Sequence, residues 1–196
     1  MICGAPCEID TRLVSGFVIA ADSGLDRCKA AGITPDLAVG DFDSAKSGVP
    51  EGVERVRAPS EKDDTDTFLA ARIAVERGYN ELRFFCALGG RASHSLANIQ
   101  MLRDLKRRGI RGTLFGERCA ALLLENESLG VPKFRGYLSL FALDDTAVVS
   151  EKGVKYPLDR HTLTNSFPLG VSNEITNEFA EITVHSGLCA VILEED

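Results

Sequence analysis

The first 117 residues alternate short apolar runs with segments of helical periodicity, and this alternation constrains the fold more than any other feature. Apolar runs at 17–21 and 82–88 have the length of strands, while 65–77 and 93–108 gather apolar residues on one face of a helix. Strands that alternate with helices predict a parallel sheet, so we expect an α/β domain over residues 1–117, an open, mostly parallel, Rossmann-like sheet with flanking helices. The residues expected on the buried faces of the two helices are Phe68, Leu69, Ile73 and Val75 in the first, and Asn98, Met101, Leu102 and Leu105 in the second.

After about residue 117 the hydrophobic pattern changes to a period of two. Apolar and polar residues alternate at 137–142 and 181–185, and turn residues such as 144–145 and 186–187 separate the runs. This pattern is typical of antiparallel sheets with one buried face. We therefore expect a second domain over residues 118–196, built as an antiparallel sandwich or barrel.

Charge and composition exclude several classes of function. The 196 residues include 22 Lys and Arg against 29 Asp and Glu, a net charge of −7, so the chain lacks the basic excess that attracts nucleic acid or anionic membranes. No apolar run approaches the ~20 residues that span a bilayer. The start, MICGAPCEID, has neither the basic nor the apolar region of a signal peptide. We expect a cytoplasmic protein that binds neither nucleic acid nor a membrane.

The six cysteines are scattered and form no C-x-x-C pair. Cys3 and Cys7 could supply half of a metal site, but no second pair at zinc spacing accompanies them. We therefore expect all six to be free thiols in a reducing compartment.

Polar residues follow three of the predicted strands where each strand ends, at 22–24, 40–44 and 89–91. Ligands of an open parallel sheet bind at the carboxyl ends of its strands, so we expect a site there. Asp41 and Asp43 are two residues apart and leave an extended backbone on the same face, where their charges repel each other. A hard cation such as Mg²⁺ between them removes the repulsion. Two solvated turn aspartates are the alternative interpretation.

A second acidic cluster supports the metal interpretation. Lys62-Asp63-Asp64-Thr65-Asp66 precedes the helix expected at 65–77. A carboxylate at a helix N-terminus accepts hydrogen bonds from free backbone N–H groups, so we expect one of these acids to cap the helix. With Glu61 included, the cluster holds more acids than capping requires.

The segment 89–91, Gly-Gly-Arg, lies between an apolar run and a helix and suits a phosphate group. Glycines let the backbone approach, helix N–H groups point at the anion, and Arg91 offers a planar fork. His94 and Asn98 are one turn apart on the helix face near this segment, although a packed or surface histidine is the alternative. We expect His161 and His185 in a loop and a strand, without partners.

Seven segments together carry a resemblance to a known family. They are Ala21-Asp22-Ser23-Gly24, Pro35-Asp36-Leu37, 40–44, 62–66 and 89–98 in the first part, and 150–158 and 170–174 in the second. In this order they resemble the thiamin pyrophosphokinase family. The resemblance implies an α/β nucleotide-binding domain followed by a β-sandwich, in a homodimer whose thiamine sites lie between subunits. The implied reaction transfers the pyrophosphoryl group of ATP to the hydroxyl of thiamine, giving thiamine diphosphate and AMP.

The resemblance also implies a role for each matching position. Asp41, Asp43 and Asp66 would hold Mg²⁺ and serve catalysis. Asp22, Gly24, Gly89, Gly90, Arg91, His94 and Asn98 would contact ATP. Lys62, Ser150, Tyr156, Ser172 and Asn173 would bind thiamine. One carboxylate would take the hydroxyl proton of thiamine, and the motifs leave open which one.

Three positions depart from the family pattern. Ser23 replaces a glycine, Ser93 replaces an aspartate, and Tyr156 stands where the family has tryptophan; an aromatic face suits the cationic thiazolium of thiamine. Two alternatives remain open. One is a HAD-like Mg²⁺-dependent phosphatase with Asp41 as nucleophile and Asp43 as acid/base. The other is a non-catalytic sensor of thiamine or nucleotide that has lost activity through Ser93.

Overall fold

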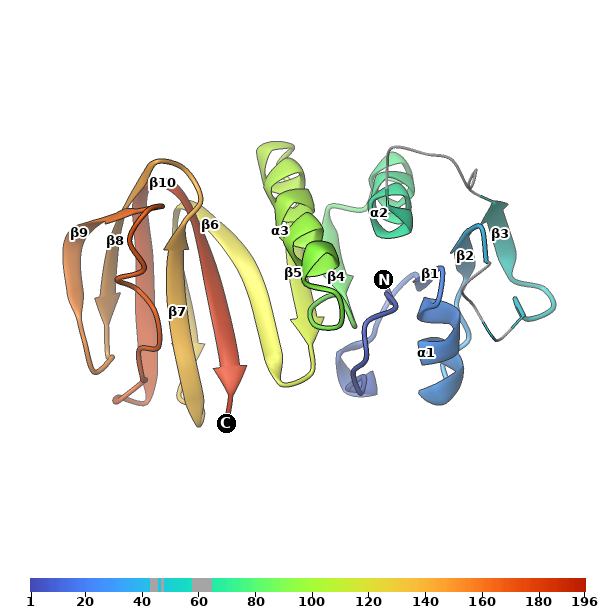
Figure 1. Ribbon diagram of the computed structural model, residues 1–196, viewed down its shortest axis with the longest axis horizontal. Helices are drawn as coiled ribbons and strands as arrows, with labels where there is room; N and C mark the ends of the chain where they lie inside the picture. Colours follow the sequence, from blue (N-terminus) through green and yellow to red (C-terminus); the bar gives the residue numbers. More distant parts are fainter. Residues whose placement is uncertain (43–45, 47, 58–64) are drawn as a thin grey trace. The chain divides into compact units, whose positions relative to one another are not determined.

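Parallel strands form the framework of the first part of the chain (Figure 1). The computed structural model describes residues 1–42, 46, 48–57 and 65–196, which form two units, Met1–Glu117 and Arg118–Asp196. The elements of the first unit are the 3₁₀ turn Thr11–Leu13, β1 Ile19–Ala21, α1 Gly24–Ala30, β2 Leu37–Gly40, β3 Glu54–Arg57, α2 Asp66–Glu76, β4 Glu81–Phe84, α3 Ala92–Arg107 and β5 Arg111–Gly116. Strand β2 pairs in parallel with β1 and β3, and β4 pairs in parallel with β5, so the expected parallel α/β architecture is confirmed.

The first residues of the chain join the two parallel ladders of this unit, which the sequence pattern does not predict. Ile2 is fully buried and bridges Ala20 of β1 on one side and Phe85, just after β4, on the other. Its N–H donates to the carbonyl oxygen of Ile19 at 2.8 Å, and the N–H of Cys3 donates to that of Phe85 at 2.8 Å. The segment 1–3 therefore acts as a further extended element between β1 and β4.

The buried faces of the two long helices differ in their agreement with the sequence pattern. The face predicted for α3 is confirmed, because Asn98, Met101, Leu102 and Leu105 are its buried residues. The face predicted for α2 is wrong, because its buried residues are Ala70, Ala71 and Ala74, while the larger apolar residues are half-buried. Helix α2 packs on β1 and β2, and alanine side chains allow a close approach that larger ones would prevent.

Strand boundaries also depart from the apolar pattern. Strand β3 was not predicted, because its sequence Glu-Arg-Val-Arg is charged and mostly exposed at the edge of the sheet. Strand β4 ends at Phe84, although the apolar run continues to Leu88 and is buried there. The backbone leaves the strand at Cys86, whose φ of 54° lies in the left-handed region.

Five antiparallel strands make the second unit: β6 Cys119–Pro132, β7 Gly136–Ala142, β8 Thr146–Lys152, β9 Leu158–Thr164 and β10 Phe179–Glu195. The first half of β10 pairs with β6 and β8, and its second half pairs with β6 and β7, with an irregularity between Val184 and Leu188. Strand β9 pairs with β8. Strands β7 and β9 contact each other although neither is the other's ladder partner, so the unit has the layered packing expected of a sandwich.

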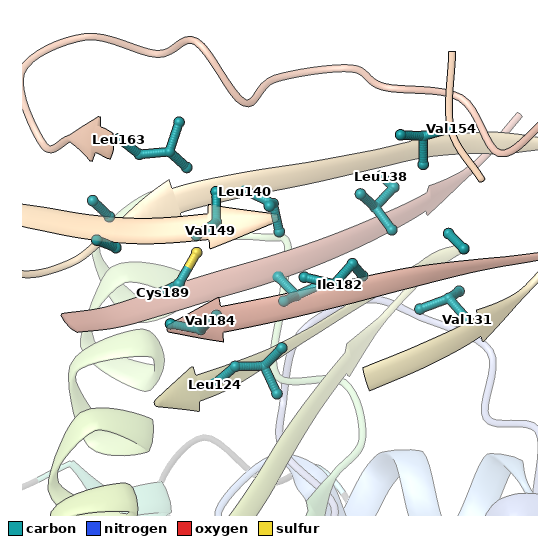
Figure 2. Packing of buried hydrophobic residues seen from close by; sticks show 14 of the residues in the cluster. Leu124, Val131, Leu138, Leu140, Val149, Val154, Leu163, Ile182, Val184 and Cys189 are labelled. Carbon is teal, nitrogen blue, oxygen red and sulfur yellow. The ribbon is translucent and has the colours of Figure 1, made fainter. Parts of the chain in front are cut away.

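The core of the second unit is aliphatic, and every strand contributes to it (Figure 2). Leu138 and Leu140 of β7, Ile182 of β10 and Val149 of β8 are almost completely buried in it. The period of two at 181–185 is confirmed along β10, where Ile182 and Val184 are buried and their neighbours are not. Along β7 the apolar residues of 137–142 are buried as expected at Leu138, Leu140 and Ala142, but the polar Ser139 between them is buried as well. This packing holds β8, β9 and β10 in the positions from which they present polar groups.

The expectation that all six cysteines are free thiols is wrong for two of them. Cys7 and Cys86 form a disulfide with their Cα atoms 5.4 Å apart, whereas Cys3, Cys28, Cys119 and Cys189 are free. The N–H of Ala5 donates to the carbonyl oxygen of Cys86 at 3.0 Å, which brings the N-terminal segment alongside the end of the β4 run. A separation of 79 residues gives no sequence signal for such a pair. Among the described residues, no helix is both long and apolar enough to cross a membrane.

Candidate active site

A pocket of about 690 Å³ lies at the carboxyl ends of the parallel strands of the first unit. We call it the strand-end pocket. Its volume is in the range of small-molecule binding sites. Its lining comprises residues 3–6 of the N-terminal segment, Ala21 at the end of β1 with Asp22 and Ser23 after it, Asp41 after β2, and Thr65, Asp66 and Thr67 at the start of α2. It also includes Cys86 and Ala87 after β4, and Gly89, Gly90, Arg91, His94 and Asn98 around the start of α3.

The strands leave the sheet at this pocket through strained backbone conformations. Asp22, Phe42 and Cys86 each have φ between 48° and 65°, which is uncommon for residues other than glycine. Gly40 has φ of 151°, and a Cβ there would lie 3.2 Å from the Cα of Asp22. Glycine therefore lets the end of β2 approach the residue that follows β1. The close approach brings the backbones that carry Asp22 and Asp41 together.

Three carboxylates of the candidate set, those of Asp22, Asp41 and Asp66, line the strand-end pocket. Asp43 lies outside the described residues, and so does Lys62. Carboxylate oxygens suit a hard ion such as Mg²⁺, which takes one or two of them and fills its remaining positions with water and phosphate oxygens. Within the described ranges, no three His, Cys, Asp or Glu residues are grouped so that they could hold a metal ion by themselves. The chemistry of the donors therefore fits an Mg²⁺ ion that also takes oxygens from its ligand.

The cap of helix α2 is a threonine, which corrects the expectation that an acid caps it. The Oγ1 atom of Thr65 accepts a hydrogen bond from the N–H of Phe68 at 3.2 Å. Asp66 is the first residue of the helix and lines the pocket. A threonine cap satisfies a free N–H group without placing a carboxylate over the helix end.

The Gly89-Gly90-Arg91 segment forms one wall of the strand-end pocket. Both glycines have positive φ, and a Cβ on Gly90 would lie 3.2 Å from Cδ of Pro6. The hydroxyl of Ser95 accepts a hydrogen bond from the N–H of Gly89 at 3.1 Å, so a residue that the sequence analysis did not single out holds this loop. Ser93 and Arg91 are both exposed.

His94 and Asn98 both line the pocket, but their environments differ. Asn98 is buried and its Nδ2 atom donates to the carbonyl oxygen of Ala87 at 2.7 Å, which ties α3 to the end of the β4 run. Partial burial and, to a smaller extent, the charge of Arg91 lower the pKa of His94. Both effects favour the neutral form of the imidazole.

Gly24 does not line the pocket. It is the first residue of α1 and is buried, and a Cβ there would collide with the carbonyl oxygen of Ile2. Its small size lets α1 pack against the N-terminal segment.

The candidate residues of the second unit form two hydrogen-bonded groups. In the first, the Oγ atom of Ser150 lies 2.8 Å from Nε2 of His185 and accepts a hydrogen bond from the N–H of Arg160 at 2.9 Å. The Nη1 atom of Arg160 lies 3.2 Å from Nδ1 of His185. The expectation that His185 has no partner is therefore wrong, since two other strands supply partners for both of its ring nitrogens.

The second group surrounds Asn173. Its Oδ1 atom accepts from the N–H of Tyr156 at 3.0 Å, and its Nδ2 atom donates to the carbonyl oxygen of Tyr156 at 2.9 Å and to Oε2 of Glu151 at 3.4 Å. Glu151 was missed by the sequence analysis; it is 1% exposed, and burial raises its pKa to about 7, with the Asn173 hydrogen bond acting in the opposite direction. The N–H of Ser172 donates to Oγ of Ser139 at 3.1 Å.

Acidic side chains and a Gly-Gly-Arg loop at the ends of parallel strands are typical of the class of proteins that bind phosphorylated ligands. Comparisons with known proteins identify one family within this class. Residues 14–114 match the thiamin pyrophosphokinase catalytic domain, and residues 125–189 match the thiamin pyrophosphokinase vitamin B1 binding domain. The chain belongs to the thiamin pyrophosphokinase family, whose members are ATP-dependent diphosphotransferases.

Individual relatives agree with this assignment. A thiamine pyrophosphokinase of Bacillus subtilis is 29% identical over 187 residues, which cover 91% of this chain and 87% of the relative. The crystal structure of a thiamine pyrophosphokinase from the same species has a TM-score of 0.89 at 26% identity, covering 99% of this chain and 97% of the other. The thiamin pyrophosphokinase of Candida albicans has a TM-score of 0.82 at 15% identity, covering 99% and 88%, and shows the shared fold.

Proposed function

We propose that the strand-end pocket binds ATP with Mg²⁺ and that the pyrophosphoryl group of ATP is transferred there to the hydroxyl of thiamine, giving AMP and thiamine diphosphate. The observation that supports this most is the convergence of Asp22, Asp41 and Asp66 with the 89–91 loop in one pocket. Transfer of phosphoryl-type groups depends mainly on positioning and on neutralising charge, and this pocket offers groups for both.

Each side of the pocket has a distinct task in this proposal. Asp41 and Asp66, with Asp43, would hold Mg²⁺, which neutralises charge on the polyphosphate oxygens when it is bound. Arg91 and the N–H groups at the start of α3 would hold phosphate oxygens, because the guanidinium and the helix N-terminus both favour an anion. His94, whose lowered pKa favours the neutral imidazole, would act as a hydrogen-bonding group. The hydroxyl proton of thiamine would go to one of the carboxylates.

We assign thiamine to residues of the second unit. Tyr156 is 61% exposed and offers an aromatic face to the cationic thiazolium. The Nζ atom of Lys155 lies 5.6 Å from the centre of its ring, so one face of the ring already has a cation near it and the other would receive thiamine. Ser150, Ser172 and Asn173 would supply polar contacts, and Lys62 is assigned to thiamine binding as the family resemblance implies.

A homodimer with thiamine sites at the subunit interface is part of this proposal, as the family resemblance implies. A cytoplasmic location stays a prediction. The Cys7–Cys86 disulfide counts against that location, because disulfides are rare in reducing compartments such as the cytoplasm. Size-exclusion chromatography with light scattering tests the dimer: a mass of about twice 21.2 kDa supports it, and a monomer contradicts it.

The reaction is tested by incubating the protein with ATP and Mg²⁺, with and without thiamine, and measuring every phosphorylated product. We expect AMP only when thiamine is present, in equal amount to thiamine diphosphate, and no product in excess EDTA. Phosphate release without thiamine would instead indicate a phosphatase. Binding of thiamine or ATP without any turnover would indicate a sensor.

A further inference from the structure

The hydroxyl of Ser150 has hydrogen-bond partners on both neighbouring strands. Ser150 is 7% exposed and lies on β8, between β9 and β10. Its Oγ atom accepts a hydrogen bond from the backbone N–H of Arg160, on β9, at 2.9 Å. The Nε2 atom of His185, on β10, lies 2.8 Å from the same oxygen. The second nitrogen of His185 faces Nη1 of Arg160 at 3.2 Å.

The donor and acceptor roles in this group follow from the guanidinium. A guanidinium can only donate, so Nδ1 of His185 must accept from Arg160 and cannot carry a proton. The single ring proton is then on Nε2, which donates to Oγ of Ser150. The hydroxyl oxygen thus accepts two hydrogen bonds, from His185 and from the N–H of Arg160, which uses both of its lone pairs.

The hydroxyl hydrogen of Ser150 therefore remains available as a donor. With these roles, neither hydrogen bond of Ser150 within the described part of the chain uses the hydroxyl hydrogen. A buried polar hydrogen without an acceptor is costly and is normally satisfied by a partner or a ligand.

The backbone around Arg160 is distorted in a way that serves this arrangement. The register between β8 and β9 shifts between Val149 and Glu151, opposite Ser150, as in a β-bulge. Arg160 has φ of 45°, an uncommon conformation for a residue with a side chain. Its N–H is thereby directed to a side-chain oxygen instead of the strand ladder. Strained residues and bulges of this kind concentrate at functional sites.

We propose that His185 and Arg160 are positioning residues that fix Ser150 as a hydrogen-bond donor toward an acceptor atom of thiamine, such as a ring nitrogen of its aminopyrimidine. This inference rests on the proposed binding of thiamine by Ser150. Neither residue touches the substrate; both act through the serine hydroxyl. Because the hydroxyl has no lone pair left, the site favours an acceptor and disfavours a donor at that position.

The test compares His185→Gln with His185→Leu. Glutamine can still donate from Nε2 to Ser150 and accept from Arg160, whereas leucine can do neither. We expect His185→Leu to raise the KM for thiamine about tenfold, with the KM for ATP changed less than about twofold, and His185→Gln to stay within about twofold of the wild type. His161→Leu, on the neighbouring strand β9 and exposed, is the matched control and leaves both KM values unchanged.

A double variant separates positioning from simple structural support. In the Ser150→Ala background the hydroxyl is absent, so adding His185→Leu should have no further effect on the KM for thiamine. If His185→Leu does not fold, Arg160→Lys and Arg160→Met provide the same comparison, because lysine still donates to Nδ1 and methionine does not.

The inference is overturned if His185→Leu binds thiamine like the wild type, if glutamine is as damaging as leucine, or if the KM values for thiamine and ATP rise together. Failure of the proposed function would look different, because the wild-type protein itself would then form no AMP with thiamine.

Discussion

Asn173 holds Tyr156 by both ends of its side-chain amide, accepting from its N–H at 3.0 Å and donating to its carbonyl oxygen at 2.9 Å. Two further hydrogen bonds, from the N–H of Glu174 and to Oε2 of Glu151, complete the capacity of the amide. The side chain of Asn173 therefore fixes the backbone that presents the exposed Tyr156 ring, and Glu151 anchors Asn173 from within the core.

We expect Tyr156→Ala to raise the KM for thiamine by about 5- to 30-fold while the KM for ATP stays within about twofold. The ring offers a face to a cation, a contact of roughly 1–2 kcal/mol. Steady-state kinetics with each substrate varied in turn measure both values. Phe179→Ala is a suitable control, because Phe179 is 62% exposed in the same unit, much like Tyr156 at 61%. A larger effect on the KM for ATP than for thiamine would place Tyr156 at the nucleotide instead.

Replacing Asn173 by aspartate should destabilise the protein by about 1–3 kcal/mol and raise the KM for thiamine. A carboxylate cannot donate to the carbonyl oxygen of Tyr156 or to Oε2 of Glu151, so both hydrogen bonds of the amide nitrogen are lost. Urea unfolding and thiamine kinetics measure the two effects. Asn80→Asp, at an exposed position before β4, serves as the control for the change of charge. Unchanged stability and thiamine KM would show that the amide does not position Tyr156.

Glu151 should make the stability of the protein fall as pH rises from about 4.5 to about 7. Burial raises its pKa from 4.5 to about 7, so in this window the folded protein retains a proton that the unfolded chain has released. The loss is complete above pH 7, where the buried carboxyl must be ionised, and amounts to about 3 kcal/mol.

Urea unfolding of the wild type and Glu151→Gln at pH 5, 6, 7 and 8 measures this effect. The glutamine variant should match the wild type at pH 5 and exceed its free energy of unfolding increasingly up to pH 8. Glu181→Gln, exposed on β10, should show no such trend. A difference between wild type and Glu151→Gln that is the same at every pH would contradict the assignment.

Reduction of the Cys7–Cys86 disulfide should lower the free energy of unfolding by about 2–4 kcal/mol, because the cross-link restricts a long loop of the unfolded chain. It should also raise the KM for ATP, since Cys86 and Pro6 line the strand-end pocket. Unfolding and kinetics with and without dithiothreitol measure both effects. Cys119→Ser should respond to reductant like the wild type, and Cys7→Ser should not respond. An oxidised wild type indifferent to reductant would contradict this account.

The sequence pattern predicts those parts of the fold in which hydrophobic periodicity decides the structure. The buried face of α3 and the alternation along β10 follow from burial alone, so they were predicted correctly, whereas the buried Ser139 breaks the alternation expected for β7. The face of α2 was not, because close packing selects small alanines over larger apolar residues. Strand β3 was missed because an exposed edge strand needs no apolar pattern.

The parts of the site that depend on distant segments could not be predicted. The partners of His185 come from β8 and β9, and the bulge that turns the N–H of Arg160 toward Ser150 has no signature in the sequence. The Cys7–Cys86 pair and the insertion of Ile2 between two ladders depend on contacts across about 80 residues of chain. By contrast, the acidic and glycine-rich strand ends were recognisable because a parallel sheet brings the carboxyl ends of its strands to one edge.

The central claim is that the carboxylates at the strand ends serve the transfer of the pyrophosphoryl group, and Asp41→Asn tests it most directly. The measurement is the rate of thiamine-dependent AMP formation at saturating Mg²⁺, ATP and thiamine, with urea unfolding as the check on folding. Asp104→Asn is the control. Asp104 lies on α3, its Oδ2 atom is 3.5 Å from Nη1 of Arg108, and it does not line the strand-end pocket. We predict a loss of kcat of about 100-fold or more for Asp41→Asn, with stability close to that of the wild type. A kcat equal to that of the wild type would contradict the account.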